Sequence, residues 1–188
     1  MDIAKVIVTE LKKKEIISEE EYEVYVYGME ILILKGIASI IAIGLSFILQ
    51  TTEFLFLLLL FLVPIRKYAG GAHASSKEAC LFLTEMILVI AQIAWKYGIG
   101  KEMFQTCSVT IGLLMVILFS PAESKKRRLT MLKRKSFRIR SILFGCINVL
   151  CYSVACVFGC DIVKSAVSVA MMIEATLIVL QKVLKEHE

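Results

Sequence analysis

The sequence has very little proline and histidine, with two of each among 188 residues. Proline interrupts helices, so its scarcity favours long helices without breaks. Only His73 lies within the body of the chain, because His187 is one residue from the end. No Cys-x-x-Cys pair is present either, so we expect no metal site, no redox pair and no cofactor.

Polar residues are too few to cover a water-soluble surface. The chain is 58% hydrophobic, with a mean hydropathy of +0.77. Its apolar residues form six long blocks, which are more typical of helices in lipid than of a buried core. The blocks cover residues 31–49, 54–65, 80–95, 103–119, 142–160 and 166–180. The sequence therefore predicts an all-α, polytopic integral membrane protein, with residues 1–188 as a single domain in the bilayer.

The second block is shorter than the others. It has about 12 residues, whereas a helix needs ~17–20 to span the hydrocarbon. A tilted helix, a re-entrant segment or an extension by flanking residues would each account for it. Pro64 and Pro121 lie at block ends, where we expect them to stop helices.

Residues 1–20 do not have the pattern of a secretory signal peptide. They mix charges of both signs and place Ile3, Val6, Ile7 and Leu11 on one helical face. This pattern predicts an amphipathic helix on the membrane surface. A solvated helix that caps the bundle fits the same pattern.

Lysine and arginine are distributed unevenly between the predicted connections. Residues 50–53 contain none and residues 66–78 contain three, whereas residues 125–140 contain nine. The nine are Lys125, Lys126, Arg127, Arg128, Lys133, Arg134, Lys135, Arg138 and Arg140. Basic segments stay in the cytoplasm. Six crossings then place both termini, the segment 66–80 and a basic loop at 120–140 inside.

Five of the six cysteines lie inside apolar blocks: Cys107, Cys146, Cys151, Cys156 and Cys160. The last four are spaced so that they scatter around a helix, and we interpret all five as small apolar side chains. Cys80 is different, because it begins its block beside polar sequence.

That polar sequence is RKYAGGAHASSKEAC, residues 66–80, in which Arg66 and Cys80 each lie seven residues from His73. On one continuous helix, residues seven apart are ~10 Å apart along the axis. A histidine must come within ~3–4 Å of a thiol to take its proton. A working pair therefore requires a break in the helix, and Gly70 with Gly71 provides one.

The letters SSKE that follow predict a capping box, with Ser75 as N-cap and Glu78 at the third helical position. Cys80 would then lie in the second turn of a new helix, with His73 in the loop before it. Arg66 could stabilise an oxyanion or hold a substrate carboxylate. Alternatively, His73 is an interface residue, and Arg66 and Lys67 only anchor the helix end.

Residues 66–80 resemble the signature of the accessory gene regulator B family (AgrB), the membrane cysteine endopeptidases of Gram-positive quorum sensing. In that family an arginine, a Gly-x-His and a cysteine recur with the spacing of Arg66, Gly71, His73 and Cys80. FSPAESKKRRL at 119–129 resembles the family's basic segment, and MIEATLIVL at 172–180 resembles its last helix. Length and block pattern are similar over essentially the whole chain.

The resemblance implies an endopeptidase in a Gram-positive cell membrane, as a homodimer, with an AgrD-type propeptide as substrate. Cys80 would attack the scissile carbonyl with His73 as general base, and a cysteine or serine of the peptide would close a thiolactone or lactone ring. A basic patch would attract an acidic peptide tail; its residues are Lys125, Lys126, Arg127 and Arg128. No nucleic-acid partner is expected.

Two other functions fit the composition alone. A small transporter or channel subunit would use the intramembrane acids Glu85 and Glu174 to mark an ion path. A membrane scaffold would use the basic loop to bind anionic lipid. No third catalytic group is assigned, because Glu85 lies off the face of Cys80 and the predicted capping box accounts for Glu78.

Overall fold

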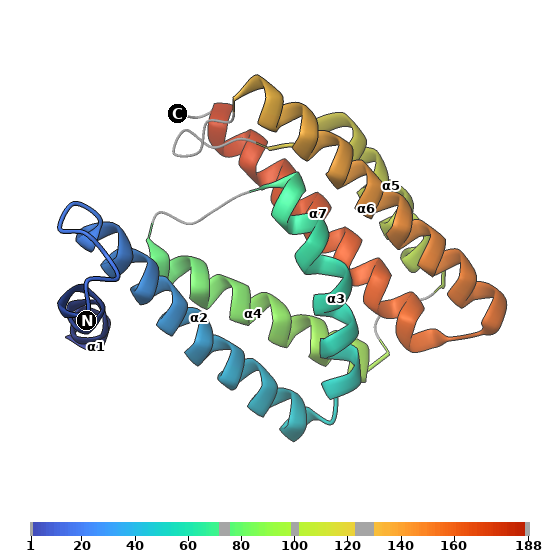
Figure 1. Cartoon of the computed structure of the whole chain (residues 1–188). Coiled ribbons are helices and arrows are strands. Elements are labelled where there is room, and N and C mark those ends of the chain that lie inside the picture. Colours follow the sequence, from blue (N-terminus) through green and yellow to red (C-terminus); the bar gives the residue numbers. More distant parts are fainter. Residues whose placement is uncertain (1, 72–75, 99–101, 123–129, 187–188) are drawn as a thin grey trace.

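The computed structural model describes residues 2–71, 76–98, 102–122 and 130–186. These residues form helices joined by short connections, and the described ranges contain no strand beyond an isolated bridge between Gly70 and Ala122. The helices are α1 (Asp2–Lys13), α2 (Tyr22–Leu49), α3 (Thr52–Ala69), α4 (Lys77–Lys96), α5 (Glu102–Phe119), α6 (Met131–Phe158) and α7 (Asp161–Glu186) (Figure 1). The predicted all-α class is confirmed, and the six apolar blocks correspond to α2–α7.

Within the described parts of the chain, five helices are long and apolar enough to cross a membrane: α2, α4, α5, α6 and α7. Large apolar side chains cover much of their outer surface; Ile48 on α2 is 77% exposed and Val157 on α6 is 83% exposed. Such a surface is stable in lipid rather than in water. The chain is therefore a multi-pass membrane protein.

The short second block is extended by its flanking residues into the 18-residue helix α3. The residues of α3 include three charged ones, Glu53, Arg66 and Lys67, and α3 is not one of the five spanning helices, yet it runs from end to end of the same bundle (Figure 1). The prediction that Pro64 stops this helix is wrong. The helix continues to Ala69, because packing against α6 and α7 holds the last turn, and a proline removes only one hydrogen bond near a helix end.

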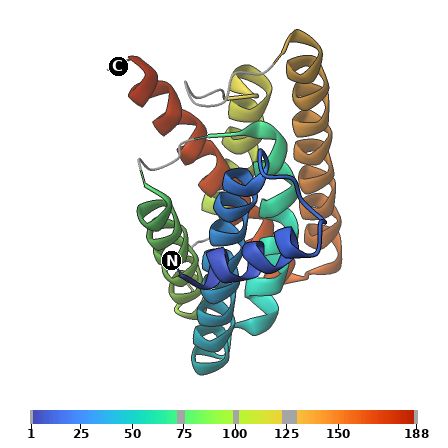
Figure 2. The ribbon, with the colours of Figure 1, turned by 60° about the vertical axis from the view of Figure 1, so that its left-hand side comes forward.

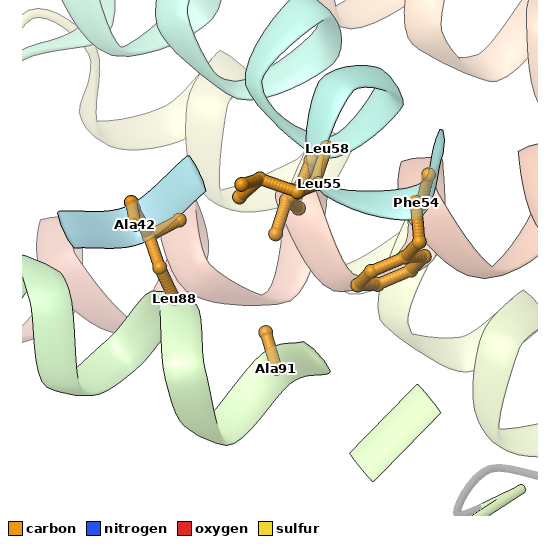
Figure 3. Packing of buried hydrophobic residues seen from close by; sticks show 8 residues of the cluster. Ala42, Phe54, Leu55, Leu58, Leu88 and Ala91 are labelled. Atoms are coloured by element: carbon orange, nitrogen blue, oxygen red, sulfur yellow. The ribbon is translucent and has the colours of Figure 1, made fainter. Parts of the chain in front are cut away.

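One apolar cluster joins α3 to α2, α4 and α7 (Figure 3). Small residues on α2 let the helices approach closely. At the far end of the cluster the rings of Phe54 and Trp95 stack with centroids 4.9 Å apart. The labelled members of the cluster are Ala42, Phe54, Leu55, Leu58, Leu88 and Ala91.

A second cluster joins α3 to α5, α6 and α7. The backbones of α5 and α7 come very close at Gly112, where an added Cβ would lie 2.8 Å from the Cβ of Met171. Near the C-terminal end of α3, the ring of Tyr68 stacks on Phe144 of α6 with a centroid distance of 5.6 Å. The Tyr68–Phe144 contact and the cluster residues Ile65 and Ala69 fix the end of α3 that carries Arg66.

The amphipathic helix α1 packs on the start of α2 through a small cluster that contains Val8 and Val26. Ile3 and Val6 of the predicted apolar face are 67% and 62% exposed. Leu11 of the same predicted face packs against the cluster, whereas Ile3 and Val6 remain available to a membrane surface. After α1, the Ser18 backbone and hydroxyl donate to Glu21, which lowers the pKa of this carboxyl.

Several helix ends lie toward one end of the bundle, at the left and top in Figure 1 and in the upper half of Figure 2. They are the N-terminal ends of α2, α4 and α6 and the C-terminal ends of α3, α5 and α7. This arrangement brings Arg66, Cys80 and the basic start of α6 to the same end. The predicted loop at 120–140 is helical from Met131 onward, so its last basic residues lie on α6.

Candidate functional site

Arg66 lies in the last turn of α3, and the chain leaves the helix at two glycines. Gly70 has φ 80° and Gly71 has φ 121°, a region that side chains other than glycine rarely adopt. The Nη1 group of Arg66 donates to the carbonyl oxygen of Gly70 at 2.5 Å. The predicted helix break is confirmed, and the arginine itself holds the turn.

Gly71 is buried between Arg66 and α7. A Cβ at this position would overlap the Arg66 guanidinium and lie 3.3 Å from the backbone carbonyl carbon of Leu177. Only glycine fits between the arginine and the helix. The requirement for glycine at position 71 of the Gly-x-His motif is thus explained by the limited space as well as by the backbone angle.

The turn is also tied to the connection between α5 and α6. The N–H group of Ala122 donates to the carbonyl oxygen of Ala69 at 2.7 Å. A Cβ at Gly70 would lie 2.5 Å from the oxygen of Ala122. Gly70 therefore allows two connections, far apart in sequence, to run side by side.

Cys80 lies in the first turn of α4. The N-cap is Ser76, whose Oγ accepts a hydrogen bond from the N–H of Ala79 at 3.1 Å, and the N–H of Cys80 donates to the oxygen of Ser76. The predicted cap at Ser75 is therefore wrong by one residue. Ser76 has the extended backbone that an N-cap needs, which puts Ala79 rather than Glu78 at the third position.

The thiol of Cys80 is partly exposed, and none of the six cysteines forms a disulfide bond. Helix α4 begins apart from the end of α3 in both views (Figures 1 and 2). The structure thus places Arg66 and Gly71 against α7 and Cys80 on α4, at the same end of the bundle but on different helices. The other predicted site residues lie outside the described residues: His73, Lys125, Lys126, Arg127 and Arg128.

A cavity of about 320 Å³ opens beside Ala122, at the end of α5. Its walls include apolar side chains from α5 and α7, together with Arg134 and Lys182. The ammonium group of Lys182 lies 4.3 Å from the centroid of the Phe119 ring. A basic rim over apolar walls suits an anionic group with apolar neighbours. In the sequence, Arg134 belongs to the predicted basic loop, and nothing there brings it together with Lys182.

Glu174 is the site residue whose place the sequence did not reveal. Its side chain is 0% exposed and its Oε2 lies 4.0 Å from Arg66 Nη1. Glu85 lies on α4, which packs mainly against α2, whereas Glu174 faces α3. The two acids of the proposed ion path therefore belong to different helix interfaces. Among the described residues, no group of histidine, cysteine and acidic side chains comes together to hold a metal.

These features define a class of protein. It is an all-α multi-pass membrane protein that carries, at one end of its bundle, an arginine–glycine turn and a cysteine in the first turn of a helix. Comparison with known protein families identifies the family of this chain. The family model of Accessory gene regulator B matches residues 4–180. The chain belongs to this family.

Individual relatives are distant but cover much of the chain. The Accessory gene regulator protein B of Staphylococcus intermedius is 26% identical over 150 residues, which are 78% of this chain and 77% of that protein. The protein of the same name from Staphylococcus epidermidis is 29% identical over 63% of this chain and 61% of its own length. A Putative AgrB-like protein 2 of Clostridium perfringens is 27% identical, over 71% and 66%. No solved structure matches.

Proposed function

We propose that this protein is a membrane cysteine endopeptidase that cleaves the C-terminal tail from an AgrD-type propeptide and allows the remaining peptide to cyclise. The single observation that carries the proposal is the position of Cys80. It is a partly exposed thiol in the first turn of α4, at the end of the bundle where the arginine–glycine turn lies. The family to which the chain belongs and the spacing of Arg66, His73 and Cys80 support the same function.

The reaction begins when His73 takes the proton of the Cys80 thiol. The Sγ atom then attacks the scissile carbonyl carbon, and the peptide C–N bond breaks as His73 returns the proton to the leaving amine. The product is a thioester between Cys80 and the peptide. A thiol or hydroxyl within the peptide attacks that thioester, which releases the Cys80 thiol and closes the ring.

The start of α4 offers partial positive charge to an anion that binds there. The first backbone N–H groups of a helix point toward its N-terminal end and carry partial positive charge. The N–H group of Ala79 donates to the Oγ atom of Ser76, and the N–H group of Cys80 donates to the backbone carbonyl oxygen of Ser76. The N–H groups of the two residues between Ser76 and Ala79 remain directed toward the end of the helix.

Arg66 supplies a fixed positive charge at the turn that precedes His73 in the chain. Its side chain is 24% exposed, and its guanidinium is held by the turn that follows it. Such a group offsets the charge of an oxyanion or binds a carboxylate of the peptide. Lys125, Lys126, Arg127 and Arg128 follow Ala122 in sequence, and they attract an acidic peptide tail to the same end.

This end of the bundle faces the cytoplasm in our proposal, and the membrane is the cell membrane. The exposed basic side chains at the start of α6, among them Lys133 and Lys135, lie at this end. The turn at the other end of α3, residues 50–53, has no basic residue. The positive-inside rule then sets the orientation.

The test is coexpression with an AgrD-type propeptide, followed by mass spectrometry of the products. We expect a released tail and a ring product whose mass is lower by the mass of that tail and shows no added water. A linear product that is heavier than the ring product by one water molecule would indicate hydrolysis of the thioester without cyclisation. An intact propeptide with the folded protein in the membrane would contradict the proposal.

A further inference from the structure

A carboxyl group is buried where α7 packs against the end of α3. Glu174 is 0% exposed, and among the described residues neither carboxylate oxygen has a hydrogen-bond partner. Met171 and Ile178, on the same face of α7, belong to the apolar cluster that also contains Ile65 and Ala69 of α3. A carboxylate in such surroundings is unfavourable unless a cation lies close to it. Packing alone does not require an acid at this position.

Arg66 provides the cation. Its Nη1 lies 4.0 Å from Oε2 of Glu174, and its side chain is 24% exposed. The guanidinium thus reaches from a buried carboxylate to the accessible end of the bundle. The same Nη1 donates to the carbonyl oxygen of Gly70 at 2.5 Å. The arginine is held between α7 on one side and its own turn on the other.

Helix α7 supports the turn at two successive levels. Glu174 faces Arg66, and Leu177, three residues further along, lies against Gly71. Because Gly71 has no side chain, the guanidinium can occupy the space beside it. The position of Arg66 therefore depends on a charge from α7 and on a gap left by glycine.

We propose that Glu174 is a positioning residue for Arg66. Its buried carboxylate fixes the guanidinium at the α3–α4 turn, where the arginine offsets negative charge on the peptide substrate. The role of Arg66 in this statement rests on the proposed endopeptidase function. The orientation of Arg66 by Glu174 does not, so the two ideas can fail separately.

The first test does not use activity. Purified wild-type protein and a Glu174→Gln variant in detergent micelles are treated with phenylglyoxal, which modifies arginine, and the modified sites are quantified by mass spectrometry. We expect Arg66 to react several-fold faster in the variant, because its guanidinium is no longer held. The exposed side chains of Arg138 and Arg140 on α6 serve as internal controls and should react at unchanged rates.

A Glu174→Leu variant provides a second form of this test in case the Glu174→Gln variant does not fold. Leucine suits the apolar surroundings of the site, and the cation that remains, Arg66, is partly exposed and still donates to the carbonyl oxygen of Gly70. It should also expose Arg66 to the reagent. An unchanged rate at Arg66 in either folded variant would overturn the proposal, whether or not the protein cleaves a peptide.

The second test is kinetic and uses an AgrD-type propeptide. Glu174→Gln and Arg66→Lys should each lower the cleavage rate per folded molecule on the order of tenfold and change the same constant, kcat or KM. The double variant should be no slower than the slower single variant, because Glu174 acts through Arg66. Losses that multiply would overturn the proposal. Absence of cleavage by the wild type would instead refute the endopeptidase function, and the phenylglyoxal rates would still decide the role of Glu174.

Discussion

The N–H group of Ala122 donates to the carbonyl oxygen of Ala69 at 2.7 Å, and this bond joins the end of α3 to the connection after α5. Gly70 and Ala122 form an isolated bridge beside it. The segment with His73 and Cys80 follows Ala69 in the chain, and the segment with Lys125–Arg128 follows Ala122. Both segments of the proposed site are therefore joined in the chain to one fixed junction.

A Gly70→Ala substitution should break this junction. The added Cβ would lie 2.5 Å from the Ala122 oxygen, and alanine disfavours the φ of 80°. We expect a loss of about 1–3 kcal/mol in the free energy of unfolding, together with weaker processing. Thermal unfolding in detergent and propeptide cleavage measure the two effects.

Gly159→Ala is the matched control for this prediction. Gly159 has φ 67° but no atom within 4 Å of an added Cβ. It should therefore show only the backbone strain, about 1 kcal/mol, and normal cleavage per folded molecule. Equal effects of the two substitutions would show that contact with Ala122 is unimportant.

The contact between α5 and α7 gives a prediction on stability alone. At Gly112, an added Cβ would lie 2.8 Å from the Cβ of Met171 and 2.9 Å from its backbone oxygen. Gly112→Ala should destabilise the bundle by about 1–3 kcal/mol, because two backbones must separate. Gly44→Ala on α2 has open space around it and should be neutral or slightly stabilising. Melting temperatures in one detergent provide the comparison.

Much of this fold could be predicted from the sequence because lipid imposes simple rules. The long apolar blocks predicted the helices, and the pair of glycines predicted the break after α3. The length of α3 could not be predicted in the same way. Its ends are charged, and Pro64 suggested an earlier stop, but contacts with α6 and α7 hold the helix through Ala69. Such contacts involve residues far apart in sequence.

The site was predictable only where local pattern decides it. The spacing of Arg66 and Cys80 is visible in the sequence, and so is a serine cap. Which of two adjacent serines caps α4 depends on the backbone path, and the structure selects Ser76. The partner of Arg66 could not be found from the sequence, because Glu174 lies more than a hundred residues away and only folding brings them to 4.0 Å.

The proposed orientation can be tested at two exposed positions, Glu78 at the start of α4 and Gln50 at the opposite end of the bundle. In a background without the native cysteines, we expect an impermeant maleimide to label Gln50→Cys in intact cells. Glu78→Cys should react only after the membrane is opened, because basic residues gather at its end. The reverse labelling pattern would contradict a cytoplasmic site.

The basic segment after Ala122 should act on the substrate through long-range attraction. Neutral glutamine in place of Lys125, Lys126, Arg127 and Arg128 should weaken processing at limiting peptide, with the larger effect at low salt, because salt screens the attraction. Cleavage rates at two salt concentrations measure it. The orientation assay above is the control for insertion. Unchanged processing at limiting peptide would leave these residues with membrane anchoring alone.

The central chemical prediction concerns the cysteines. Cys80→Ser should lose cleavage by on the order of 10³-fold or more, because a hydroxyl is a poorer nucleophile than a thiolate and a poorer leaving group in ring closure. His73→Ala should fail at the same step, before any covalent adduct forms. The remaining cysteines should be dispensable, since four of them lie within α5 and α6 and Cys160 lies in the connection before α7, at the opposite end of the bundle.

A modified peptide separates the two halves of the reaction. With a propeptide that lacks its internal cysteine or serine, the wild-type protein should accumulate a thioester adduct, because ring closure is blocked and only slow hydrolysis remains. Digestion and mass spectrometry should map the adduct to Cys80. The matched control replaces the other five cysteines with serine or alanine and should form the same adduct at a similar rate. An adduct on any other cysteine, or full cleavage by Cys80→Ala, would show that the nucleophile is a different residue.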